Sequence, residues 1–249
     1  MRGFNDSDKP EGIQSYFIIN LVLDIRDLVT GLGKSTFTLI GHDWGGFVSW
    51  TFASFYPQML DNLVICNVPH PIPFFQSRRK NWKQILKSWY MHFFQVPFLP
   101  ELQMLSEDMK AFDAMFEDNP NNDEAVIEAY KYAFRDYETW NRTINYYRCL
   151  TYFHSFIHMH LLYSCYTILL YYCKSSVILD ESDKRWKIKV RTLHIFGTAD
   201  MAIEVEPAKE TAEWVDDYTL ELLEGVSHWV QEQEPANVND LIENFISNS

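Results

Sequence analysis

The sequence predicts an α/β protein in which a mostly parallel sheet carries helices on both faces and is interrupted by a long helical insertion. Two observations predict this class. Short runs rich in β-branched and apolar residues alternate with helical patterns near both ends of the chain, an order typical of parallel sheets. Between residues 74 and 186, by contrast, no convincing strand pattern occurs and aromatic-rich helical patterns follow one another.

The composition is that of a folded globular protein of one or two domains. Of the 249 residues, 47% are hydrophobic and 22% are charged, which excludes a mainly disordered chain. The formal net charge of -13 repels phosphate backbones and argues against nucleic acid as a partner. The 4 cysteines form no CxxC pair, so we expect free thiols in a reducing compartment. The oligomeric state does not follow from the sequence.

The first part of the chain predicts a helix, a strand, a tight turn and a second helix. Residues 15–33 place apolar side chains on one helical face, and Gly33 ends that pattern. A β-branched run at 35–40 precedes a glycine-rich turn at 41–46, and an apolar helix then continues to about residue 55.

The rest of the chain predicts a helical insertion followed by a return of the α/β pattern. A second strand is predicted at 63–66, and the proline-rich run 68–73 after it indicates a domain boundary. The predicted helices of the insertion are 82–94, 101–116, 122–134 and 137–149. The later elements are a strand at 190–196, a helix near 206–214, a strand at 218–223 and a helix at about 237–246. We therefore predict three segments: a first part of the core at 1–71, a helical cap at 72–186, and a second part of the core at 187–249.

One stretch between Arg148 and Lys174 carries no acidic or basic side chain. We considered a membrane span there and reject it, because the stretch contains histidines, tyrosines and Ser164. A crossing would also place the two halves of the site described below on opposite sides of a bilayer. His154 and His158 have the spacing of zinc ligands on a helix, but no third ligand is near in the sequence. We predict neither a metal nor a cofactor.

The motif that carries chemistry is Gly41-His42-Asp43-Trp44-Gly45. It has the form G-x-nucleophile-x-G at a strand-to-helix turn, which is how the α/β-hydrolase fold presents its nucleophile. Here the nucleophile is Asp43 in place of serine, and this selects the reaction. A serine attacking a strained or halogen-bearing sp3 carbon would give an ether, whereas a carboxylate gives an ester that an activated water can hydrolyse. A carboxylate is also ionised at neutral pH, so its attack needs no general base.

The acid and the histidine of a triad are expected after later strands, in that order. Asp200 follows the third predicted strand, and His228 follows the fourth. His228 would deprotonate the water that attacks the ester on Asp43, while Asp200 would orient and stabilise the imidazolium. The backbone N–H of Trp44, at the start of a helix, would donate to the oxyanion of that step.

These motifs resemble the epoxide hydrolases of the α/β-hydrolase fold, in particular the animal epoxide hydrolase-like proteins. The similar segments are residues 2–10, 37–46, 67–71 and 228–231. The resemblance implies a small, apolar epoxide as substrate. It also implies two cap tyrosines that hydrogen-bond the epoxide oxygen and donate a proton as the ring opens, and by motif context these are Tyr90 and Tyr147. The chemistry needs them because an alkoxide without a nearby acid is a poor leaving group.

The chain departs from the family pattern in two places. Family members carry a His-Gly-x-Pro turn, and strands of one half of the sheet, upstream of the Arg-Gly-Phe segment. This chain contains neither, so we expect a late start site or a truncated gene model. Residues 151–178 also look foreign to the family. Since related proteins can carry an N-terminal anchor, the location stays open between the cytoplasm and the membrane of the endoplasmic reticulum.

The sequence leaves three functions to be distinguished. The first is hydrolysis of an epoxide to a vicinal diol, although which epoxide does not follow from the sequence. The second is a haloalkane or haloacid dehalogenase, which uses the same Asp nucleophile and Trp44 but stabilises a halide; Tyr90 and Tyr147 favour the epoxide. The third is a non-catalytic fragment.

Overall fold

Four parallel strands form the sheet of the computed structural model within the residues it describes, which are 1–117, 124–160 and 186–248. The strands are β1 (Phe37–His42), β2 (Leu60–Cys66), β3 (Thr192–Gly197) and β4 (Tyr218–Leu223), and they lie side by side in this order. Each neighbouring pair is parallel. All four strands therefore end at the same edge of the sheet, where the loops that follow them meet.

The described residues divide into two compact units. The first contains residues 1–25, 90–117 and 124–160, and the second contains residues 26–89 and 186–248, which include the whole sheet. The division of the chain into core and cap segments at 1–71, 72–186 and 187–249 stays a prediction.

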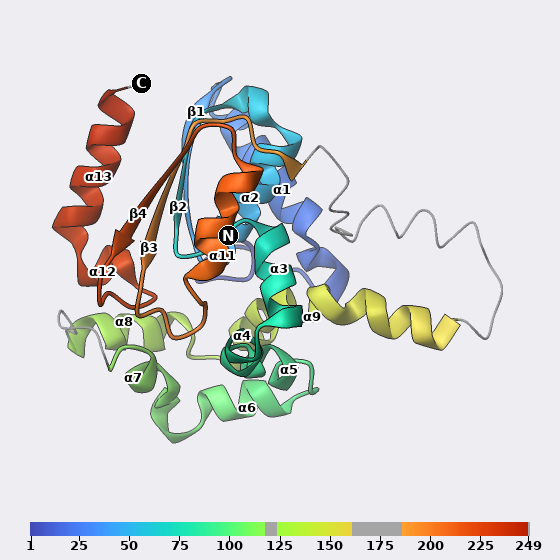
Figure 1. Cartoon of the computed structure of the whole chain (residues 1–249). Helices are drawn as coiled ribbons and strands as arrows, with labels where there is room; N and C mark the ends of the chain where they lie inside the picture. The colour runs from blue at the N-terminus through green and yellow to red at the C-terminus, as the bar shows by residue number, and fades with distance from the viewer. Residues whose placement is uncertain (118–123, 161–185, 249) are drawn as a thin grey trace. The chain divides into compact units, whose positions relative to one another are not determined.

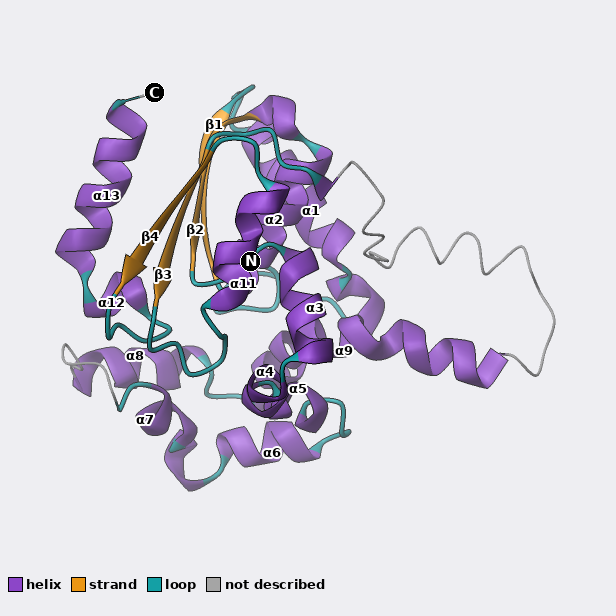
Figure 2. Cartoon of the chain, in the orientation of Figure 1, coloured by secondary structure: helices purple, strands orange, loops and turns teal. Residues whose placement is uncertain are grey.

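Helices accompany the strands throughout the chain (Figures 1 and 2). The α-helices are α1 (Ile18–Gly31), α2 (Trp44–Phe55), α3 (Pro71–Lys80), α4 (Trp82–Lys87), α5 (Trp89–Phe93), α6 (Leu99–Leu105), α7 (Ala111–Met115), α8 (Glu124–Ala133), α9 (Tyr137–His160), α11 (Glu206–Glu210), α12 (Val230–Gln233) and α13 (Pro235–Ser247). The 3-10 helices are η1 (Ile13–Tyr16), η2 (Pro57–Met59), η3 (Glu107–Met109) and η5 (Thr211–Trp214).

Both faces of the sheet are covered in the second unit. On one face, Val64 and Leu193 pack in a core cluster with Val238 and Phe245 of α13. On the other face, the ring of Trp50 in α2 packs edge-on against the ring of His194 in β3. Figure 1 shows α2 and α13 on opposite sides of the strands. Burial on both faces explains why the central strands are almost continuously apolar rather than alternating. The α/β class and the parallel sheet predicted from the sequence are confirmed.

The strand β1 is the last strand at its end of the described sheet. It is less buried than β2 and β3, and Ile40 is 51% exposed. An apolar side chain is therefore accessible next to a row of backbone groups that have no neighbouring strand among the described residues.

The structure corrects several predicted elements. Helix α3, which the sequence did not predict, begins within the proline-rich run, because His70 accepts a hydrogen bond from Ile72 N and prolines are tolerated in the first helical turn. The helix predicted at 101–116 is broken into α6, η3 and α7, since residues 107–109 adopt positive φ. The helix predicted at 82–94 is divided between α4 and α5.

The stretch that looked foreign to the family lies mostly outside the described residues. Its first part, 151–160, continues helix α9. Within the described ranges, no helix is long and apolar enough to cross a membrane.

In the first unit, a buried ion pair joins helices α6 and α9. The Arg148 guanidinium donates to both carboxylate oxygens of Glu101, at 2.7 and 3.2 Å, and Asn141 donates to the same carboxylate. Burial acts to raise the pKa of Glu101, but the hydrogen bonds from Arg148 outweigh it and keep the pKa below the usual value. A carboxylate with no exposed surface is tolerated here because it has partners on both oxygens.

In the second unit, His194 of β3 is fully buried beside Trp50, Phe196 and Tyr218. The Tyr218 hydroxyl donates to the Ala208 carbonyl, so His194 Nδ1, at 2.6 Å from that hydroxyl, must carry the proton. Its Nε2 has no hydrogen-bond partner among the described residues. Burial lowers the pKa of His194 to about 3.

We predict that His194→Phe keeps the fold at neutral pH and weakens the loss of stability in acid. The unfolded histidine has a pKa of about 6.5, so below that pH the unfolded state binds a proton that the folded state excludes, and stability falls as pH falls. Without His194, about one proton fewer should be taken up on unfolding near pH 5. Urea unfolding of both proteins between about pH 4.5 and 7.5 measures this. An unchanged pH dependence would contradict the assignment.

Candidate active site

The turn between β1 and α2 holds Asp43 in a strained backbone conformation. Asp43 has φ 50 and ψ -122, in the positive-φ region that side chains rarely adopt. A Cβ built on Gly41 would lie 2.4 Å from Ser49 Oγ and 2.5 Å from the Gly45 carbonyl oxygen, so only glycine fits there. The tight turn leaves the Asp43 side chain 36% exposed, at the start of α2. This is the strand-to-helix geometry predicted from the motif.

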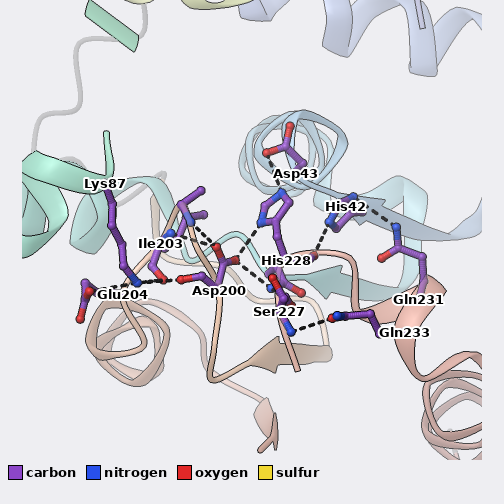
Figure 3. A network of polar contacts seen from close by, with 12 residues as sticks. His42, Asp43, Lys87, Asp200, Ile203, Glu204, Ser227, His228, Gln231 and Gln233 are labelled. Atoms are coloured by element: carbon purple, nitrogen blue, oxygen red, sulfur yellow. Dashed lines mark hydrogen bonds and ion pairs between the residues drawn. The ribbon is translucent and has the colours of Figure 1, made fainter. Parts of the chain in front are cut away.

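The structure brings together three of the predicted site residues from distant parts of the chain (Figure 3). His228 Nε2 lies 3.3 Å from Asp43 Oδ1, and His228 Nδ1 lies 2.8 Å from Asp200 Oδ2. The Asp200 side chain has no exposed surface, and that of His228 is 8% exposed. The imidazole therefore lies between two carboxylates, one accessible and one buried.

Asp200 is held by hydrogen bonds to both of its oxygens. Its Oδ1 accepts from the backbone N–H groups of Ala202 at 2.7 Å and Ile203 at 3.0 Å. Its Oδ2 accepts from His228 and, at 2.8 Å, from the side-chain amide of Asn67. Burial acts to raise the pKa of Asp200, but the charge and hydrogen bond of His228 and the other donors outweigh it and lower the pKa. Asp200 is therefore an ionised, oriented acceptor.

Two further residues of this site, Asn67 and His42, are not among those that the sequence predicts. Asn67 lies directly after β2, has φ 63, and also donates to the Ser227 carbonyl oxygen at 3.2 Å. Its signal in the sequence was a polar residue at the end of an apolar strand, within a segment already noted for its resemblance. His42 lies next to Asp43 in the motif, where the pattern G-x-nucleophile-x-G assigns no role to its side chain.

The His42 ring packs against the His228 ring and also forms a hydrogen bond to the His228 backbone. The two ring centroids are 4.8 Å apart, and His42 Nε2 donates to the His228 carbonyl oxygen at 2.9 Å. The other nitrogen, Nδ1, faces the Gln231 amide at 3.5 Å. Burial, with a smaller effect of His228, lowers the pKa of His42 to about 4. His42 is thus neutral near pH 7 and adds no second positive charge beside His228.

The electrostatics of the triad favour an ion pair at rest. Burial acts to lower the pKa of His228, but the charge of Asp200 and the hydrogen bonds to Asp200 and Asp43 raise it well above its usual value. Burial acts to raise the pKa of Asp43, but the hydrogen bond and charge of His228 and the backbone N–H of Trp44 lower it. The Trp44 N–H therefore points to the Asp43 carboxylate, where the sequence predicted an oxyanion donor.

Tyr90 and Tyr147 belong to the first compact unit and lie together in it. Their ring centroids are 5.7 Å apart at an interplanar angle of 82°, and the Phe94 ring contacts both. The Gln95 side chain donates to the Tyr147 carbonyl oxygen. The two predicted tyrosines thus share one aromatic cluster, although they are 57 residues apart in the sequence (147 minus 90).

No cluster of three or more metal-ligating side chains occurs in the part of the chain that the structure describes. The side chains of His154 and His158 lie outside that part.

Comparison with known proteins identifies the family. A family model described as alpha/beta hydrolase fold matches residues 1–235. The chain belongs to the α/β-hydrolase fold family. It is 35% identical over 254 aligned positions to Epoxide hydrolase 1 of Caenorhabditis elegans, covering 99% of this chain and 56% of that protein. It is 32% identical to human Epoxide hydrolase 4, covering 99% and 63%.

The similarity extends to solved structures. A crystal structure of a Bacillus megaterium epoxide hydrolase in complex with an inhibitor is 28% identical, with a TM-score of 0.80, over 99% of this chain and 81% of that one. The resemblance inferred from the motifs is confirmed by these relatives. The chain spans between about half and two thirds of the length of the curated epoxide hydrolases named above.

We predict that Asn67→Ala destabilises the protein more than Asn67→Gly does. Both substitutions remove the amide that donates to Asp200, but only alanine must place a Cβ on a left-handed backbone. The difference in the free energy of unfolding should be about 1 kcal/mol, measured by urea unfolding at neutral pH. Equal stabilities, or a more stable alanine variant, would show that the backbone conformation at this position imposes no constraint.

Proposed function

We propose that this chain hydrolyses a small, apolar epoxide to a vicinal diol through a covalent ester on Asp43. The observation that carries the proposal is a carboxylate at the nucleophile position of an α/β-hydrolase turn, 3.3 Å from a histidine that is paired with a buried acid. The relatives named epoxide hydrolases support the same substrate class.

In the first step, an Asp43 oxygen attacks an epoxide carbon. The C–O bond of the ring breaks, and its electron pair goes to the epoxide oxygen. Tyr90 or Tyr147 donates a proton to that oxygen, which gives a hydroxyl group and leaves a phenolate. The lowered pKa of Asp43 keeps the nucleophile ionised, so this step needs no base.

In the second step, His228 takes a proton from a water that attacks the Asp43 carbonyl carbon. The Trp44 N–H donates to the oxyanion that forms. When the intermediate collapses, the diol oxygen leaves with the proton held by His228. The second proton of the water leaves the Asp43 carboxyl group and restores the tyrosine, so the net reaction is epoxide plus water to diol. The water oxygen stays on Asp43.

The charges of the site favour this order of steps. At rest, the negative charge of Asp43 is one of the causes that raise the pKa of His228. Esterification removes that charge, so the imidazolium releases its proton to solvent once the ester has formed, and it takes a proton back from solvent when the Asp43 carboxylate is restored. His228 thus becomes a base at the stage where a base is needed.

The first test is accumulation of the ester. In His228→Gln, ester formation should proceed and ester hydrolysis should stop, so intact-protein mass should increase by the mass of the added epoxide. The double variant Asp43→Asn with His228→Gln is the matched control and should show no increase. An unmodified His228→Gln protein, together with turnover that Asp43→Asn abolishes, would contradict the role of His228. A wild-type protein that neither turns over nor is modified would favour the non-catalytic alternative.

The second test separates epoxide from halide chemistry. Tyr90→Phe and Tyr147→Phe should each slow epoxide opening by roughly tenfold to a thousandfold, as expected for loss of a positioned acid. Tyr132→Phe changes an exposed tyrosine of the same unit and should leave the rate unchanged. Comparable release of halide from haloalkanes, with no effect of Tyr90 or Tyr147, would instead support a dehalogenase.

A further inference from the structure

Side chains of helix α4 form hydrogen bonds to the loop that contains Asp200. The loop follows β3, and its residues 200–204 include the two N–H groups that orient the Asp200 carboxylate. Helix α4 lies more than 110 positions earlier in the sequence, yet both belong to the same compact unit. Figure 3 shows the Lys87 side chain reaching the loop next to Asp200.

Lys87 binds three groups of this loop. Its ammonium donates to the Asp200 carbonyl oxygen at 2.7 Å and to the Ile203 carbonyl oxygen at 3.4 Å. It also forms an ion pair with Glu204 Oε1 at 3.0 Å. A compact cation with three donors suits this arrangement of oxygens.

Gln84, one helical turn before Lys87, is fully buried and binds the same loop. Its side-chain N–H donates to the Ala202 carbonyl oxygen at 2.9 Å and to Ser88 Oγ at 3.0 Å. Its oxygen accepts from Glu204 N at 2.8 Å. Lys87 and Gln84 together therefore hold the loop at residues 200, 202, 203 and 204.

The same loop residues hold the carboxylate. Ala202 and Ile203 each present a carbonyl oxygen to helix α4 and an N–H to Asp200 Oδ1. Fixing the peptide groups on the helix side thus fixes the donors on the acid side. The chain of contacts runs from Lys87 and Gln84 through the loop to Asp200, and from Asp200 Oδ2 to His228 Nδ1.

We infer that Lys87 and Gln84 are positioning residues that keep Asp200 aligned with His228 during hydrolysis of the Asp43 ester. The inference rests on the proposed function. It concerns one step only, because Asp200 and His228 act on the water, whereas ring opening uses Asp43 and the tyrosines. Loosening the loop should therefore slow hydrolysis of the ester and spare its formation.

The experiment measures the two steps separately in a single turnover of the 249-residue chain with an aromatic epoxide such as styrene oxide. Quenched samples are weighed as intact protein, so the rise of mass reports ester formation and its fall reports hydrolysis. In Lys87→Met, hydrolysis should slow by about tenfold to a hundredfold, the range for a misplaced catalytic group, while ester formation keeps its rate. Lys87→Arg retains the charge and should recover most of the hydrolysis rate.

Lys83→Met is the matched control, because Lys83 is an exposed lysine of the same helix. It should behave as the wild type in both steps. Glu204→Gln removes the ion pair but leaves the contacts of Gln84 and the backbone, so it should slow hydrolysis less than Lys87→Met does. If Lys87→Met does not fold, the smaller Glu204→Gln effect decides the matter, and its absence would overturn the inference. Equal slowing of both steps in Lys87→Met, or no slowing of either, would also overturn it.

A second measurement needs no substrate. The proton on His228 Nδ1, hydrogen-bonded to Asp200, should give a far-downfield proton resonance in the wild type and in Lys83→Met. In Lys87→Met it should broaden by faster exchange with water, and an unchanged resonance there would overturn the inference. If the wild type forms no ester but this resonance still depends on Lys87, the proposed function fails and the positioning of Asp200 stands.

Discussion

The buried charge of Asp200 is the constraint on which the rest of the site depends. A carboxylate removed from water costs several kcal/mol unless partners replace its hydration, and breaking such a set of partners is more damaging than never forming it. The structure supplies four donors to this one group, from the loop itself, from Asn67 directly after β2 and from the loop after β4. One of the four is the imidazole of His228, so the contacts that satisfy the charge also fix the orientation of that ring. The contacts that stabilise the buried charge are thus also the contacts that set the geometry of the candidate site.

The parallel sheet explains how residues so far apart in the chain meet. Each strand runs in the same direction, and each contributes one polar residue as it ends: Asp43 after β1, Asn67 after β2, Asp200 after β3 and His228 after β4. Each strand of the sheet thus shows the same order along the sequence, an apolar run followed by a polar residue that belongs to the site. Helices α2 and α13 bury the two faces of the sheet and hold the strands in place. The polar residues that follow the strands then meet at one edge of the sheet.

Much of this pattern could be predicted from the sequence, because strand ends are marked by a change from apolar to polar residues. That signal located Asp43, Asp200 and His228, and it was present at Asn67 as well. Helix α3 was missed because prolines usually indicate a boundary, although they are compatible with a first helical turn. Lys87 and Gln84 could not have been found in this way. They lie in a basic, mixed segment that resembles a solvent-exposed face, and only the fold brings the loop after β3 against it.

The strained turn at Asp43 has a consequence for how such a site can change. A Cβ at position 41 would meet Ser49 Oγ and the Gly45 carbonyl oxygen, so the close approach of β1 to the start of α2 depends on glycine there. The backbone at position 43 is therefore set by the packing of the turn, and its side chain starts from a conformation that this packing has already fixed. A larger residue at position 41 would therefore change the geometry of the candidate site without replacing any group that takes part in the proposed reaction.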